Sequence, residues 1–306
     1  MMPDNQDSSR GFAFAVSAYV LWGLLPLYMK ALAHISPAEV IAHRILWSVP
    51  VAGLVLVLIG RTGDLRQALT SPRTLAMAAV TAALVTVNWG IYVWSISADQ
   101  ALDAALGYYI NPLFSVLLGA VVLRERLGPA QIAAILLAAA AVVLLTVEAG
   151  RVPMVAIGLT FSWGLYAFFK KWLPIGPNQG FMLEVLLLTP LALGYVAWLV
   201  GTGRNHLWAG NPVDTWLLLG CGVITAAPLM IYANGAKLLR LSTIGILQYI
   251  TPTMIFLTAV FVFGEEFSGA RRIAFPMIWL ALLIYSTTLV RQARSARRGV
   301  APPRPQ

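Results

Sequence analysis

Long apolar runs separated by short polar breaks make up almost the whole chain. A helix needs about 20 mostly apolar residues to cross the hydrocarbon core of a bilayer. Most breaks contain turn residues or charges, although little more than Asp99 divides the third run from the fourth. Ten runs reach the required length, at residues 11–31, 38–59, 74–97, 101–123, 129–147, 153–173, 180–201, 214–236, 241–263 and 272–291. The pattern predicts an all-α polytopic membrane protein with ten transmembrane helices.

The sequence also repeats itself at an interval of about 140 residues. Trp22-Gly23-Leu24 recurs as Trp163-Gly164-Leu165, and Tyr109-Ile110-Asn111-Pro112 recurs as Tyr249-Ile250-Thr251-Pro252. Each copy contains five predicted spans, and because five is odd, the second copy must lie upside down in the membrane. The predicted architecture is two inverted five-helix repeats around a central cavity, as in secondary transporters.

The repeat sets the expected domain boundaries. Residues 11–149 form the first repeat and residues 150–291 the second, inverted one. A polar tail, residues 1–10, precedes the first span, which contains no small-residue cleavage site and is expected to stay uncleaved. A basic tail, residues 292–306, follows the last span.

Composition places these spans in lipid. Apolar residues make up 59% of the chain and charged residues 11%, against roughly 25% charged in soluble domains. The net charge of +9 comes from basic residues between the apolar runs and at the C-terminus, so it indicates orientation in a membrane and not a nucleic-acid partner. With the N-terminus inside, 15 basic residues fall on the cytoplasmic side and five on the outer side. Both termini are therefore predicted to be cytoplasmic.

Ionisable side chains within the spans are candidate functional positions, because a charge at a span centre costs about 2.5–3.5 kcal/mol on insertion scales. Arg44 and Glu184 occupy equivalent positions in the two copies, and His43 precedes Arg44. Arg44 is expected to bind an anionic group of a substrate or to pair with Glu184 across a cavity. The alternative is that Arg44 snorkels to the outer interface. Glu184 is the candidate proton-coupling carboxylate.

Aromatic and amide side chains share helical faces with these charges. Rings can stack on a planar molecule and amides can orient it. The alternatives are the aromatic belt at the membrane interface and hydrogen bonds between helices. The candidate substrate-binding residues are Trp22, His43, Arg44, Trp47, Asn88, Tyr92, Tyr108, Tyr109, Asn111, Trp163, Gln248 and Tyr249.

Prolines recur at matching depths in the two copies, as Pro50 with Pro190 and as Pro112 with Pro252. Each removes a helix hydrogen bond and tends to kink the helix. The freed carbonyl then needs another partner or water. These four prolines are candidate gating positions, and helix-packing geometry is the alternative explanation.

Other function classes lack their motifs. The chain has neither a Gly-x4-Gly-Lys-Ser/Thr loop for nucleotide hydrolysis nor a Gly-x-Ser-x-Gly elbow. His34, His43 and His206 have no acidic or cysteine neighbours at metal-ligand spacing, and the single Cys221 excludes an intrachain disulfide. No catalytic residues, cofactor or metal are therefore expected.

In combination, these motifs resemble a known family. The chain is similar to the RarD family, of the EamA branch of the drug/metabolite transporter superfamily, in residues 18–30 (AYVLWGLLPLYMK), 43–48 (HRILWS), 88–89 (NW), 106–113 (LGYYINPL) and 241–253 (LSTIGILQYITPT). The resemblance implies a bacterial inner-membrane protein with ten helices around a central cavity, which exports small organic metabolites or drugs or lets them permeate. Related members often have Gly-Glu after span four, where this chain has Arg124-Glu125. Gly264-Glu265 keeps the family pattern after span nine.

The sequence thus predicts a secondary transporter that works by alternating access on a small organic substrate bound near the midplane. Two alternatives remain open: an accessory membrane protein with a vestigial cavity, and a membrane-embedded enzyme acting on lipid-linked substrates. The sequence leaves open the substrate, the direction of transport, the coupling ion and the choice between monomer and homodimer.

Overall fold

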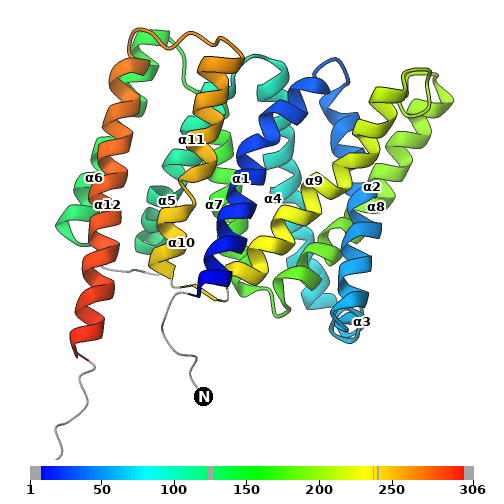
Figure 1. Ribbon diagram of the computed structural model, residues 1–306, viewed down its shortest axis with the longest axis horizontal. Coiled ribbons are helices and arrows are strands. Elements are labelled where there is room, and N and C mark those ends of the chain that lie inside the picture. Colours follow the sequence, from blue (N-terminus) through cyan, green and yellow to red (C-terminus); the bar gives the residue numbers. More distant parts are fainter. Residues whose placement is uncertain (1–7, 123, 125–126, 237, 240, 300–306) are drawn as a thin grey trace, which may run out of the picture.

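The computed structural model describes residues 8–299 except 123, 125–126, 237 and 240, and these residues form a bundle of helices (Figure 1). The helices are α1 (Ser9–Ala31), α2 (Pro37–Leu58), α3 (Thr62–Leu69), α4 (Pro72–Ser97), α5 (Ala101–Val122), α6 (Pro129–Ala149), α7 (Met154–Trp172), α8 (Pro177–Gly201), α9 (Pro212–Ala236), α10 (Leu241–Leu247), α11 (Ile250–Leu257) and α12 (Arg271–Gly299). A π-helical turn, Thr258–Val262, follows α11.

The predicted fold class is confirmed. Within the described residues, nine helical stretches are long and apolar enough to cross a membrane, and each overlaps a predicted span. The tenth, α7, ends in Lys170-Lys171-Trp172, and these residues lower its mean hydropathy. It nevertheless packs between α4 and α5 as a full member of the bundle.

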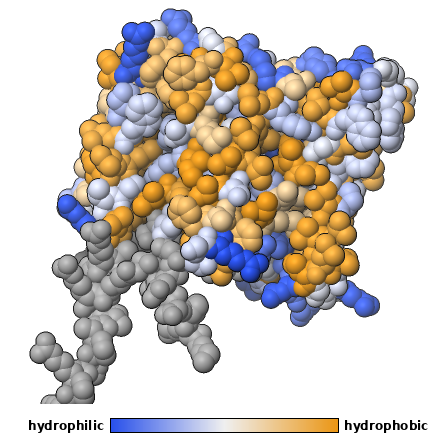
Figure 2. Space-filling view, in the orientation of Figure 1, coloured by the Kyte–Doolittle hydropathy of each residue, from blue (hydrophilic) through white to orange (hydrophobic). Residues whose placement is uncertain are grey.

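The surface of the bundle fits a bilayer. Large apolar side chains such as Leu58, Val147 and Phe261 are about three-quarters exposed, at 74%, 75% and 77%. In Figure 2, apolar residues cover the middle of the visible face, and hydrophilic residues gather at its upper and lower edges. Exposed apolar surface on this scale needs lipid as its solvent.

Helix packing follows the internal repeat. In the first half α1 lies against α9 and α11, and at the equivalent place α7 lies against α4 and α5. The contact of α2 with α9 has its counterpart in the contact of α8 with α4, and α6 packs against its own counterpart α12. If each helix is replaced by its counterpart in the other half, its neighbours are therefore nearly the same.

The two copies also run in opposite directions. Glu39, in the first turn of α2, binds His206, which follows α8. Gln179, in the first turn of α8, binds Asp64, which follows α2, at 3.2 Å. Each helix thus begins where its counterpart ends, and this antiparallel pairing is what an inverted repeat requires. The domain boundaries near residue 150 remain a prediction.

Two local features differ from the simple pattern of apolar runs and polar breaks. The break between the spans 38–59 and 74–97 contains the short helix α3, whose Ala68 lies in one buried cluster with Leu183 on α8. The ninth span was expected to be one kinked helix, and it is instead divided at Gln248 and Tyr249 into α10 and α11. Pro252 explains the break, because it offers no N–H to the carbonyl of Gln248, and its ring clashes with that carbonyl.

The equivalent Pro112 has a different effect, since α5 stays continuous from Ala101 to Val122. Matching prolines therefore do not produce matching breaks. Pro50 and Pro190 likewise lie inside the unbroken helices α2 and α8.

Close packing of α2 on α9 depends on Gly222. A Cβ atom there would lie 2.1 Å from the backbone oxygen of Trp47, whereas one on Gly194 would have nothing within 4 Å. Small residues allow membrane helices to approach this closely.

We expect Gly222→Ala to destabilise the protein by about 1–3 kcal/mol, the usual cost of overpacking. The matched variant Gly194→Ala should be close to neutral. Thermal unfolding of both variants in the same detergent measures the difference, and equal midpoints would contradict the close approach of α2 and α9.

Candidate functional site

Buried polar side chains gather where helices of the two halves meet. Residues His43, Arg44, Asn88, Asn111 and Glu184 are each at most 6% exposed. They come from α2, α4, α5 and α8. Such groups are rare in the bilayer and usually face a partner or a cavity. We call this set, with the aromatic residues described below, the polar centre.

Arg44 occupies one end of the polar centre. Its Nε donates a hydrogen bond to Thr225 Oγ1 on α9 at 3.0 Å, and its guanidinium lies 4.7 Å from the centre of the Trp89 ring on α4. Its Nη1 is buried without a hydrogen-bond partner among the described residues. Tyr92 and Tyr108 lie within electrostatic range. Arg44 is 3% exposed, so it is held inside the protein and does not snorkel to the interface.

Glu184 occupies the other end, with a partner that the sequence did not predict. Its Oε1 accepts a hydrogen bond from Lys170 Nζ at 2.6 Å, and its Oε2 accepts one from the Tyr166 hydroxyl at 3.3 Å. The possible pairing with Arg44 is therefore wrong. Lys170 lies near the cytoplasmic end of the predicted span 153–173, its side chain is only 17% exposed, and it neutralises Glu184 within the second half.

Aromatic rings connect the two ends. Ring centres are separated by 5.9 Å between Tyr92 and Tyr108, by 6.5 Å between Tyr108 and Trp163, and by 5.4 Å between Trp163 and Tyr166. Because Tyr92 and Tyr108 belong to the first half and the other two rings to the second, this aromatic row crosses the junction of the repeats.

Asn88 fixes the middle of the row. It accepts a hydrogen bond from the Tyr108 hydroxyl at 3.2 Å and donates to Ser162 Oγ at 3.0 Å and to the carbonyl of Leu159 at 3.3 Å. Its amide thus links α4, α5 and α7, so part of its role is structural. Asn111 faces α7 beside Gly164, and neither of its buried amide atoms has a partner in the described part of the chain.

His43 and Trp47 form a pair on α2. Trp47 Nε1 donates to His43 Nδ1 at 3.1 Å. Since an indole N–H can only donate, Nδ1 must be the acceptor and the ring proton must lie on Nε2. That Nε2 is buried, and no residue that the structure describes accepts its proton.

Four predicted residues lie away from the polar centre. Trp22 packs against Tyr19 and Tyr232 in a separate cluster. The ring of Tyr109 contacts Trp279 on α12, and Gln248 donates to the carbonyl of Gly245 within its own chain turn. Tyr249 packs on the edge of the large core cluster. Their predicted contact with a substrate remains untested.

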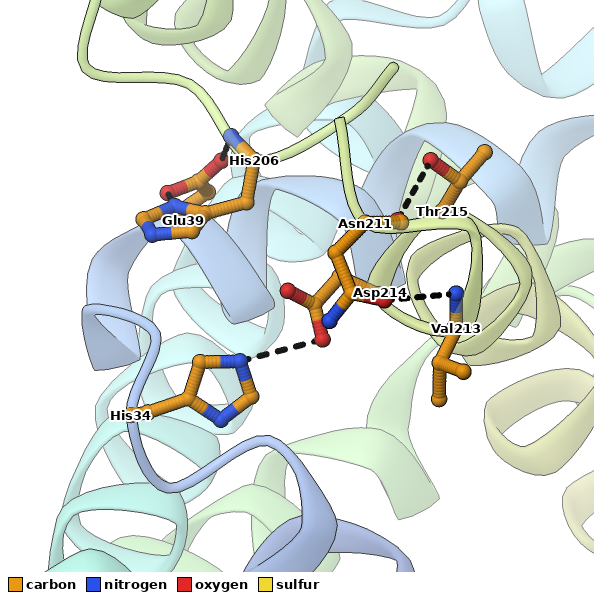
Figure 3. A network of polar contacts seen from close by, with 7 residues as sticks. All are labelled: His34, Glu39, His206, Asn211, Val213, Asp214 and Thr215. Carbon is orange, nitrogen blue, oxygen red and sulfur yellow. Dashed lines mark hydrogen bonds and ion pairs between the residues drawn. The ribbon is translucent and has the colours of Figure 1, made fainter. Parts of the chain in front are cut away.

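A second polar cluster lies at the end of the bundle opposite to Ser9, which we call the upper face (Figures 1 and 3). His206 binds Glu39 through its ring Nδ1 at 2.8 Å and its backbone N–H at 2.7 Å. His34 Nε2 lies 3.0 Å from Asp214 Oδ1. Figure 3 shows both contacts joining segments of the first half to segments of the second. Among the described residues, no group of three or more His, Cys, Asp or Glu side chains fits a metal ion.

Comparisons with known proteins agree with this fold. The model of the EamA-like transporter family matches residues 9–147. An uncharacterized transporter of Vibrio cholerae is 42% identical over 98% of this chain and 99% of its own length. Proteins named RarD from Streptomyces exfoliatus and Escherichia coli are 37% and 32% identical, over 97% and 92% of this chain and 94% and 95% of their own lengths.

A solved crystal structure that is 21% identical covers 94% of this chain and 100% of its own, with a TM-score of 0.61, and it shares the fold. An apolar helical bundle with a buried polar centre, together with these relatives, defines a membrane transporter of the drug/metabolite type. The chain belongs to the RarD group of the EamA-like transporter family, and it is a bacterial multi-pass membrane protein.

The Lys170–Glu184 pair gives a direct test of the polar centre. Lys170→Met should destabilise the protein by about 3–5 kcal/mol, because it leaves a buried carboxylate without its counter-charge. Lys171→Met changes an exposed neighbour and should have little effect. Adding Glu184→Gln to Lys170→Met should recover much of the lost stability. Thermal unfolding in detergent measures all three, and a Lys170→Met protein as stable as the Lys171→Met control would contradict the ion pair.

Proposed function

We propose that this protein is a secondary transporter that carries a small organic molecule across the bacterial inner membrane by alternating access. One observation carries the proposal most directly: polar and ionisable side chains are buried at the junction of two antiparallel halves, in a protein whose surface is apolar. Such groups are costly in lipid unless another protein group, a substrate, water or an ion pairs with them. Transporters of this architecture bind their substrates at the repeat interface.

In this proposal the substrate lies along the aromatic row. Tyr92, Tyr108 and Trp163 contact it by stacking, while Asn111 orients it through its amide, which has no partner among the described residues. His43 and Trp47 contact it from α2. Trp22, Tyr109, Gln248 and Tyr249 take part only in another conformation, after the halves have moved. The break before Pro252 and the prolines of α2, α5 and α8 are the positions at which the helices bend.

Glu184 couples transport to protons in this scheme. Its carboxylate is 1% exposed, and it is held by Lys170 and Tyr166. Protonation of Glu184 would remove its attraction for Lys170 and free α7 to shift relative to α8. The proton and the conformational change are thereby linked through one ion pair.

In this proposal, polar contacts between the halves close the upper face. Besides Glu39–His206 and His34–Asp214, the carboxylate of Glu265 accepts hydrogen bonds from the backbone of Ala101 at 2.6 Å and Leu102 at 2.9 Å. Glu148 accepts one from the backbone of Ala270 at 2.7 Å, and Arg271 binds Asp103 at 3.3 Å. We propose that these contacts form the outer gate, with both termini in the cytoplasm, and that they separate when the substrate site opens outward.

Flux into proteoliposomes tests the transport activity and identifies the substrate in the same measurement. Vesicles containing the purified protein are offered the small-molecule fraction of a bacterial cell extract under an imposed pH gradient, and their contents are identified by mass spectrometry. At least one compound should accumulate above the level in protein-free vesicles. No accumulation would contradict transport, and compounds of new mass would favour a membrane enzyme.

Glu184→Gln should abolish the accumulation that depends on the pH gradient and leave downhill exchange in place. Glu266→Gln, which removes an exposed carboxylate bonded to Ser268, is the matched control. Accumulation at the wild-type level in Glu184→Gln would remove the coupling role from this residue.

The outer gate can be tested through Cys221, the only cysteine, which is buried on α9. Combining Glu39→Gln with Asp214→Asn should speed the labelling of Cys221 by a membrane-impermeant thiol reagent about fivefold, the factor that about 1 kcal/mol gives. Asp99→Asn is the control, because Asp99 binds Lys30 within the first half. Equal labelling rates in the gate variant and the control would show that these contacts do not close the path.

A further inference from the structure

We propose that the transported molecule is a small organic monoanion, a carboxylate attached to a planar unsaturated group, and that Arg44 binds its carboxylate. This inference rests on the proposed function and narrows it to a class of substrate. It also assigns the guanidinium of Arg44 and the ring of Trp89 to one binding site.

Arg44 has no counter-charge among the residues that the structure describes. Its contacts there are with neutral groups, namely Thr225 and the Trp89 ring, with Cys221 and two tyrosines within electrostatic range. Every carboxylate in the described part of the chain has a partner other than Arg44. These carboxylates are Glu39, Asp64, Asp99, Asp103, Glu148, Glu184, Asp214, Glu265 and Glu266.

The equivalent position in the second half shows what is missing. Glu184 lies at the same depth of its helix and is neutralised by Lys170 at 2.6 Å. Within the described ranges Arg44 has no corresponding acid, although it is almost as fully buried, at 3% exposure. An isolated charge inside a membrane protein is strongly unfavourable. A substrate anion would supply the counter-charge whenever the site is filled.

Unused hydrogen-bonding groups lie at Arg44. Its Nη1 is a buried N–H donor without an acceptor in the described part of the chain, and the buried hydroxyl of Tyr92, within electrostatic range of Arg44, also lacks a partner there. An ionised carboxylate accepts hydrogen bonds and donates none, and its planar fork fits a guanidinium. An ammonium group would instead face the N–H groups and the fixed positive charge of Arg44.

The shape and total charge of the polar centre further limit the class of ligand that it can bind. The Trp89 ring already stacks on the guanidinium, and the rings of Tyr92, Tyr108 and Trp163 continue from Arg44 into the junction of the halves. Walls of this kind favour a flat ligand. The charge of Lys170 is already neutralised by Glu184, so only the single positive charge of Arg44 is left in the polar centre to bind a negative charge on the ligand. A monocarboxylate therefore fits better than a phosphate dianion.

Binding of matched probes tests this inference. We would titrate the purified, detergent-solubilised protein calorimetrically with two trios: benzoate, benzamide and benzylammonium, and indole-3-acetate, indole-3-acetamide and tryptamine. In at least one trio the carboxylate should bind roughly tenfold or more tightly than the amide, the ratio expected of a charge-assisted hydrogen bond, and the ammonium should bind least. Equal binding within both trios, or preference for an amide or an ammonium, would overturn the proposal.

Arg44→Gln should remove the preference for the carboxylate, and Arg73→Gln, which changes an exposed arginine, should keep it. A second measurement compares the wild-type protein with itself. At Cys221, within electrostatic range of Arg44, an anionic sulfonate-bearing methanethiosulfonate should react about tenfold faster than its quaternary-ammonium counterpart, after correction for their rates with a free thiol. A rate ratio at or below one would overturn the proposal even if the Arg44 variant fails to fold.

Failure of this inference and failure of the proposed function give different results. Carboxylate binding without any flux into proteoliposomes would keep the anion site and reject transport. Flux of neutral or cationic compounds, unaffected by Arg44→Gln, would keep transport and reject the anion site.

Discussion

Lipid is the solvent of this protein, and that constraint accounts for most of its structure. Backbone groups must form their hydrogen bonds within each helix, because hydrocarbon offers them no partner. For the same reason polar side chains avoid the lipid-facing surface, and they are concentrated in the loops and at the junction between the halves, while apolar side chains face outward. The polar centre is consequently not a by-product of poor packing. It is a region within the bilayer where Arg44, Asn88 and Glu184 can be accommodated.

The two halves share their helix order and their neighbours, but not their chemistry. At one pair of equivalent positions the first half carries Arg44 and the second carries Glu184, and within the described residues Glu184 alone of the two has an ionic partner. Duplication supplies a symmetric scaffold, and departures from symmetry at a few positions make its two ends different. Two such departures are the upper face, where carboxylates bind His34, His206 and Arg271, and the centre, where Arg44 has no ionic partner in the described part of the chain.

Sequence patterns predict the spans well because a helix needs about 20 apolar residues to cross the bilayer, and runs of that length are easy to recognise. They also place Arg44, Asn88 and Glu184 at the junction of the halves, since isolated polar residues stand out in such runs. They do not reveal which side chains meet. Lys170 stands beside Lys171 at the end of the predicted span 153–173, and only the turn between α7 and α8 brings it to Glu184. Trp89 and Thr225 join Arg44 from other helices, and no spacing in the sequence encodes that contact.

The effect of Pro252 has a mechanical consequence. In the first half α5 is an unbroken rod, whereas its counterpart is jointed at Gln248–Tyr249 and carries a widened π turn further on. Bending at an existing joint requires no further loss of backbone hydrogen bonds, while bending the rod does. Bending should therefore be largest at Gln248–Tyr249 and smaller at the prolines of the unbroken helices, so that the two halves contribute unequally to the conformational change.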